Sequence, residues 1–126
     1  MTSHNNDNDN DDNQVRRRQM RQIRQITFIG LINLIYSNIN YNRIFPPFIQ
    51  NVARIIHLIN QTSTRRRRYR AFDICFQLVN EEARNIYNLT FNYNIIKWVT
   101  NKFWINSSNV EKRFYNLLAQ QVNSLI

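Results

Sequence analysis

The chain has 126 residues, of which 43% are hydrophobic, and a formal net charge of +9. This length suits one modest domain, and so large an apolar fraction excludes a wholly disordered polyelectrolyte. A single cysteine excludes an internal disulfide framework, and the longest apolar stretch, Ile26 to Ile35, is too short to span a bilayer. We therefore expect a folded protein without a membrane partner.

Acidic and basic residues are unevenly distributed along the chain. Residues 1–14 contain four aspartates and no lysine or arginine, and we expect them to form a disordered acidic, Asn-rich tail. The remainder carries 17 basic residues against four acidic ones, a net charge of +13. This excess favours a polyanionic partner, for which nucleic acid is the default candidate.

Residues 15–62 are predicted to form an N-terminal helical extension. Apolar residues recur every third position from Met20 to Ile29, which indicates a helix within residues 15–39. Its later part is apolar nearly all round, so we expect burial, self-association or contact with another protein there. An Asn-rich connector over residues 37–43 and a Phe45-Pro46-Pro47 element come next, and Pro47 suits the first position of a second helix.

The C-terminal half predicts three more helices. An apolar stripe with helical spacing runs from Phe72 to Tyr87, and a second helix is expected from Asn92 to Ile105. Ser108 and Glu111 have the spacing of a capping box at the start of a third helix. Strand signals are weak, so the sequence predicts an all-α fold.

The inventory of reactive residues argues against an enzyme. One glycine excludes a phosphate-cradling loop, and one cysteine with two histidines cannot assemble a zinc finger. Cys75 lies in an apolar stripe and is expected to be a small core residue, while Glu81 and Glu82 are expected to be solvated. We therefore expect no enzymatic activity, cofactor, metal or small-molecule substrate.

The strongest local feature is the basic run from Thr64 to Phe72, because it leads directly into the three predicted C-terminal helices. From Arg65 to the C-terminus the chain resembles an HMG box, closest to the mating-type HMG boxes of fungi. The residues that carry the resemblance are Arg70-Ala71-Phe72 at the first helix, then Ile96, Val99, Thr100 and Trp104 in the second, and Val110-Glu111-Lys112-Arg113-Phe114-Tyr115 with Leu117 in the third.

The resemblance implies that residues 65–126 form an L-shaped DNA-binding domain of three helices. Its structural core would contain Phe72, Trp104, Phe114 and Leu117. The positions implied at the minor groove of double-stranded DNA are Arg65, Arg66, Arg67, Arg68, Tyr69, Arg70, Asp73, Lys97 and Lys102. The resemblance thus implies a transcription or mating-type regulator in the nucleus.

Two positions depart from the family pattern. Arg70 replaces an asparagine that contacts bases, although an arginine also suits a narrow minor groove. Asp73 occupies the position of an apolar wedge, and a carboxylate is repelled by phosphate. Phosphate attachment by the basic arm is therefore expected, whereas bending of the duplex stays open.

Two alternatives remain beside this interpretation. The chain could be a helical protein–protein interaction module whose box no longer recognises DNA, a hypothesis favoured by the apolar N-terminal helix and by Asp73. A homeodomain is suggested by Trp104-Ile105-Asn106, but the next residues, Ser107-Ser108-Asn109, lack the basic side chains of a recognition helix.

Overall fold

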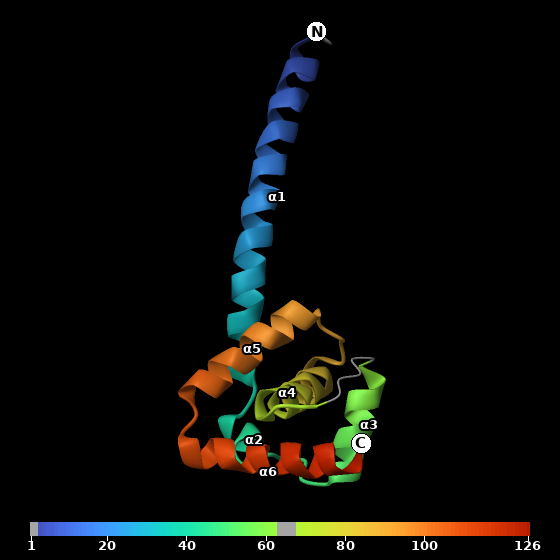
Figure 1. Ribbon diagram of the computed structural model, residues 1–126. Coiled ribbons are helices and arrows are strands. Elements are labelled where there is room, and N and C mark those ends of the chain that lie inside the picture. Colours follow the sequence, from blue (N-terminus) through green and yellow to red (C-terminus); the bar gives the residue numbers. More distant parts are fainter. Residues whose placement is uncertain (1–2, 63–67) are drawn as a thin grey trace. The chain divides into compact units, whose positions relative to one another are not determined.

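The computed structural model describes the backbone of residues 3–62 and 68–126, and the side chains of residues 12–18, 27–62 and 68–126. Over these ranges every regular element is a helix, so the predicted all-α class is confirmed. The elements are α1 (Ser3–Asn38), α2 (Tyr41–Ile44), α3 (Val52–Gln61), α4 (Ala71–Tyr87), α5 (Tyr93–Asn106) and α6 (Asn109–Leu125) (Figure 1). In the described part of the chain, none of these helices combines the length and apolar character needed to cross a membrane.

The N-terminal part differs from the expectation of a disordered tail over residues 1–14. From Ser3 onward the chain is helical, and α1 continues without a break to Asn38, so the first part of the expected 37–43 connector is helical too. Once a helix has nucleated in the apolar segment, each added residue gains one hydrogen bond at a small entropic cost, which favours extension into polar sequence.

The second predicted helix begins later than Pro47. Its first residue is Val52, because the side chain of Asn51 accepts a hydrogen bond from the backbone N–H of Arg54 at 3.2 Å and so caps the helix there. Pro47 instead lies buried in the turn after α2. The prediction of Pro47 as a first helical residue was wrong, since a side-chain cap further along fixes the start.

The chain divides into two compact units, Met1–Leu31 and Ile32–Ile126. In the second unit α4 packs against α5 and α6, as Figure 1 shows, and α3 packs against α4 and α6. The sequence had instead predicted a boundary between residues 62 and 65. The boundary lies earlier because residues 32–62 supply fully buried side chains to the same core, among them Ile35, Ile44 and Ile55.

Tyr115 joins the extension to the three C-terminal helices. Its side chain is fully buried, and its hydroxyl donates a hydrogen bond to the backbone oxygen of Ile44. Its ring lies 5.4 Å from that of Phe45 and 6.0 Å from that of Trp104. A buried phenol needs a partner for its hydroxyl, and α2 provides that partner.

The predicted core positions Phe114 and Leu117 are corrected by this arrangement. Phe114 is 43% exposed and Leu117 is 57% exposed, whereas the neighbouring Tyr115 and Leu118 are buried. Apolar residues occur in pairs here, and each step along a helix turns the side chain by about 100°. The face of α6 that becomes buried is therefore decided by the helices that pack on it, α4 and α3.

The predicted capping box at the start of α6 is confirmed. The Ser108 hydroxyl accepts from the Glu111 backbone N–H at 3.1 Å, and a Glu111 carboxylate oxygen accepts from the Ser108 N–H at 3.0 Å. The latter hydrogen bond holds the pKa of Glu111 below its usual range. Its stabilising effect is thus present above the unfolded-state pKa and is lost as the pH falls through the folded-state pKa.

Replacing Ser108 by alanine is expected to lower the free energy of unfolding by about 1 kcal/mol, because the first turn of α6 loses its side-chain cap. Urea denaturation at pH 7 measures this loss. Ser124→Ala in the exposed last turn of α6 is the control. An equal loss in both variants would contradict the capping role.

Replacing Ile44 by alanine is expected to cost about 3 kcal/mol, since its fully buried side chain would leave a cavity in the shared core. The matched control is Leu34→Ala on α1, where the side chain is 51% exposed and its loss should change little. Similar denaturation midpoints for the two variants would show that the extension is not part of the core.

Candidate nucleic-acid interface

The basic arm reaches the helices through an extended segment clasped to α6. The Tyr69 backbone N–H donates to the Asn123 side-chain oxygen at 2.8 Å, and the Asn123 amide donates back to the Tyr69 backbone oxygen at 2.8 Å. The Tyr69 side chain is only 7% exposed. Tyr69 was expected at the DNA, and this expectation is corrected: it anchors the arm by packing.

Arg68 and Arg70 flank this anchor, and both side chains are exposed. The exposed fraction of the Arg70 side chain is 74%. The two residues therefore project positive charge from a fixed point on the fold. Arg65, Arg66 and Arg67 lie outside the described residues.

Asp73 has a structural role at the start of α4. Its carboxylate accepts a hydrogen bond from the Arg70 backbone N–H at 2.8 Å and lies 3.5 Å from the Arg70 Nε atom. It thereby caps the N-terminus of α4, where a negative charge is also favoured by the helix dipole. Its side chain is 14% exposed. Asp73 therefore caps α4. The resemblance implies an apolar wedge at this same position.

A hollow of about 280 Å³ opens beside the start of α4. Phe72 contributes from α4, and Asn94, Lys97, Trp98 and Asn101 contribute from α5. Lys97, implied at DNA by the resemblance, is thus brought to the same hollow as Phe72 and is exposed. The hollow combines one cation, two aromatic rings and two amides, which is a composition suited to nucleic acid.

Lys102 points elsewhere. Its ammonium donates a hydrogen bond to the Asn33 side chain and lies 5.5 Å from the centre of the Tyr36 ring. Five residues separate it from Lys97, so the two side chains diverge by about 140° around α5. The Lys102 ammonium therefore contacts the end of α1 and does not line the hollow, and its implied role at DNA stays a prediction.

The expected corner residues Phe72 and Trp104 do meet. Their ring centroids lie 5.9 Å apart in an edge-to-face arrangement, and both side chains are half-buried. The Lys112 ammonium lies 5.5 Å from the centre of the Trp104 ring. These contacts tie the starts of α4 and α6 to the end of α5, so the hollow has a fixed wall on one side.

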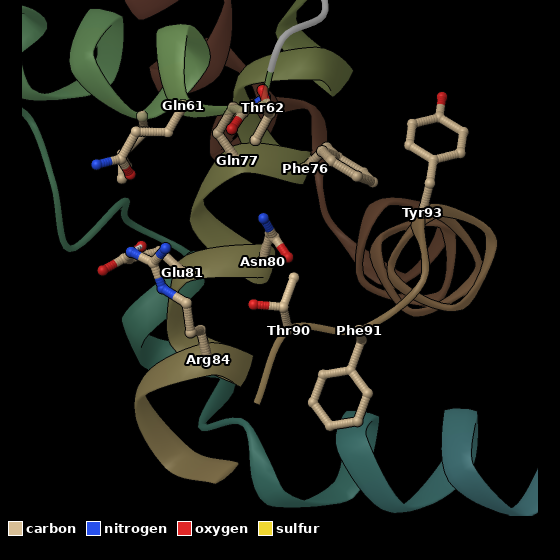
Figure 2. A pocket seen from close by; sticks show the side chains of 11 residues that line it. Gln61, Thr62, Phe76, Gln77, Asn80, Glu81, Arg84, Thr90, Phe91 and Tyr93 are labelled. Atoms are coloured by element: carbon tan, nitrogen blue, oxygen red, sulfur yellow. Dashed lines mark hydrogen bonds and ion pairs between the residues drawn. The ribbon is translucent and has the colours of Figure 1, made fainter. Parts of the chain in front are cut away.

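A second cavity, of about 330 Å³, lies between α3, α4 and the segment leading into α5 (Figure 2). Its polar groups are largely paired with one another. Gln77 donates to the Thr62 hydroxyl at 3.3 Å, and Arg84 pairs with Glu81 at 2.5 Å. Because its one acid–base pair is neutralised internally, this cavity offers no net charge to a polyanion.

Glu81 and Glu82 are not the solvated pair that the sequence suggested. Each is 7% exposed, and the carboxylate of Glu82 lies 2.9 Å from Arg43 of α2. Buried carboxylates require cationic partners, and here two arginines on different elements supply them. The Glu82–Arg43 ion pair therefore joins the extension to α4, whereas Glu81 pairs with Arg84 within α4.

Trp98, Asn94 and Asn101 were not predicted from the sequence as members of the hollow. The helical period of α5 could have indicated that Trp98 lies on the solvent-exposed side of the helix. Ile96 and Val99 define the core face of α5, and Trp98 falls about 160° from Ile96. A tryptophan on the solvent face of a helix, next to a lysine, is the signal that could have indicated this surface.

Cys75 is fully buried, as expected of a core residue, and burial raises its pKa to about 12. Only the thiolate reacts readily with alkylating agents, so modification at pH 8 is expected to require opening of the structure. We expect iodoacetamide to label the native chain far more slowly than the chain in urea, as measured by mass spectrometry. Equal labelling rates would contradict the burial.

The comparisons with known proteins found no matching family model, no matching curated protein and no matching solved structure.

Proposed function

We propose that this protein binds double-stranded DNA, with the clasped arm on phosphates and the hollow at the start of α4 facing the minor groove. The observation that carries the proposal is the anchored segment from Arg68 to Arg70. Reciprocal hydrogen bonds between Tyr69 and Asn123 hold the backbone, while Arg68 and Arg70 remain exposed. Two arginines on an anchored backbone lose less conformational entropy on meeting phosphates than arginines of a free tail would.

Charge supports the same partner. Residues 32–126 carry 12 lysines and arginines against four acidic residues, and three of the four acids are engaged by Arg43, Arg70 and Arg84. The basic residues beside these three include Lys97 at the hollow and Arg68. Neutralising DNA phosphates with such residues releases condensed counterions, which supplies a favourable entropy of binding.

The arrangement of three helices after a basic arm fits the HMG-box resemblance, which favours a nuclear regulator of transcription, of the mating-type class, as the biological role. The helix pairs α4 with α5 and α4 with α6 pack as such a domain requires, and Phe72 meets Trp104 at their junction. The sequence run Arg65–Arg68 also suits a nuclear-localisation signal.

Fluorescence anisotropy with a labelled AT-rich duplex tests the proposal. The natural chain should bind at low salt and weaken steeply as salt rises. Arg68→Ala should reduce the slope of log affinity against log salt by about 0.9, the value for one lost phosphate contact. Arg54→Ala, an exposed arginine on α3, is the control and should leave the slope unchanged.

Absence of binding at low salt, or binding insensitive to salt, would overturn the proposal. The exposed apolar side chains Phe28, Ile29 and Leu34 of α1 favour a second candidate, a protein-interaction module. It predicts self-association of the full chain, detectable by analytical ultracentrifugation, without any dependence on DNA.

A further inference from the structure

We propose that Trp98 is the side chain that inserts between base pairs, and that it directs the protein to flexible, A·T-rich steps of the duplex. This inference rests on the DNA-binding function proposed above. It concerns a residue on α5, at a distance along the chain from the arm and from the start of α4.

The two tryptophans of the chain have different surroundings. Trp104 is half-buried, with its ring against those of Phe72 and Tyr115. Trp98 is 55% exposed and lines the hollow next to Lys97. In the described part of the chain Trp98 makes none of the ring contacts that hold Trp104. An indole exposes a large apolar area to water, and burial against a base would remove that area from solvent.

The start of α4 is unsuited to the same task. Asp73 is the residue directly after Phe72, and its carboxylate is committed to the Arg70 backbone N–H at 2.8 Å. A negative charge would also be repelled by the phosphates on either side of a base step. Phe72 itself is engaged edge-to-face with Trp104. Among the residues lining the hollow, Trp98 is therefore the aromatic side chain available for insertion.

The neighbours of Trp98 favour a particular kind of step. Lys97 supplies a cation beside the inserted ring, where the two strands carry phosphates. Asn94 and Asn101 bring side-chain amides, whose NH₂ groups can donate to adenine N3 and thymine O2 in the minor groove. A guanine would present its own amino donor there instead. Unstacking is easiest at pyrimidine–purine steps, so a TpA step meets both requirements.

The charge of the unit around the hollow favours a duplex as its partner. The volume of the hollow is about 280 Å³, and it is shared by Phe72 and the α5 residues. We expect double-stranded DNA to bind at the hollow because the surrounding unit is strongly basic. Residues 32–126 contain 12 basic residues and four acidic ones. A protein partner with an apolar face would meet Lys97 within its contact, and desolvating that ammonium would cost free energy.

The test uses the full chain and a duplex with 2-aminopurine in a single central TpA step. Binding of the natural chain should raise the 2-aminopurine emission, because the base is unstacked. Trp98→Ala should abolish this rise and lower the affinity about tenfold, the effect of losing one stacked base, while the salt slope stays unchanged. A duplex with a central GpC step should bind the natural chain more weakly than the TpA duplex.

Leu117→Ala is the matched control, since Leu117 is 57% exposed, as much as Trp98, but lies on α6. It should leave emission and affinity unchanged. A Trp104→Phe variant leaves Trp98 as the only tryptophan, and its emission should be quenched by the TpA duplex.

Salt-dependent binding with the same 2-aminopurine rise in Trp98→Ala would overturn the inference and leave the proposed DNA-binding function intact. Absence of salt-dependent binding by the natural chain would overturn both. Loss of emission and affinity in Leu117→Ala as well as in Trp98→Ala would also overturn it, because general damage would then explain the loss.

Discussion

The burial of the Tyr115 phenol is the constraint on which the second unit depends. A hydroxyl removed from water must find an acceptor, and the backbone oxygen of Ile44 is that acceptor. The bond links α6 to α2 across 71 positions of the sequence. Because the same ring contacts Phe45 and Trp104, one side chain fixes both the extension and the junction of the C-terminal helices. Residues 32–62 are consequently part of the domain and not a tether before it.

The packing of this core sets the geometry of the candidate interface. Trp104 stands between Tyr115 and Phe72, so the position of α5 relative to the start of α4 is set by packed rings. The hollow is lined by Phe72 and α5, beside that junction. The clasp between Tyr69 and Asn123 holds the backbone between Arg68 and Arg70 near the C-terminal end of α6. The proposed phosphate attachment and the proposed base contact would therefore rest on different parts of one helical frame.

Helical periods in the sequence predicted much of the second unit, and tertiary partners decided the rest. The three C-terminal helices and the Ser108–Glu111 box could be predicted from apolar spacing and capping chemistry, which are local. The burial of Tyr115 instead of Phe114 could not be predicted locally, since both residues are aromatic and only the tertiary partners of α6 distinguish them.

For the charged residues too, local sequence predicted some features and tertiary partners decided the others. Glu82 was assigned to solvent because its partner, Arg43, lies far away in the sequence, and burial cannot be seen in composition. At the candidate site, Arg68, Arg70 and Lys97 were foreseen as exposed cations. The sequence did not indicate that Lys102 contacts the end of α1, and its implied role at DNA stays a prediction.

The use of Asp73 as a helix cap limits how this protein can change over evolutionary time. An apolar residue at position 73 would add a wedge but remove the carboxylate that holds the Arg70 N–H. Any such gain in contact with DNA would come together with a weaker start of α4, so it would survive only in a background stable enough to tolerate the loss. Trp98 has no comparable structural role, such as a helix cap, in the described part of the fold. If the proposed contact with DNA is made there, the outer face of α5 can change in sequence without destabilising the fold.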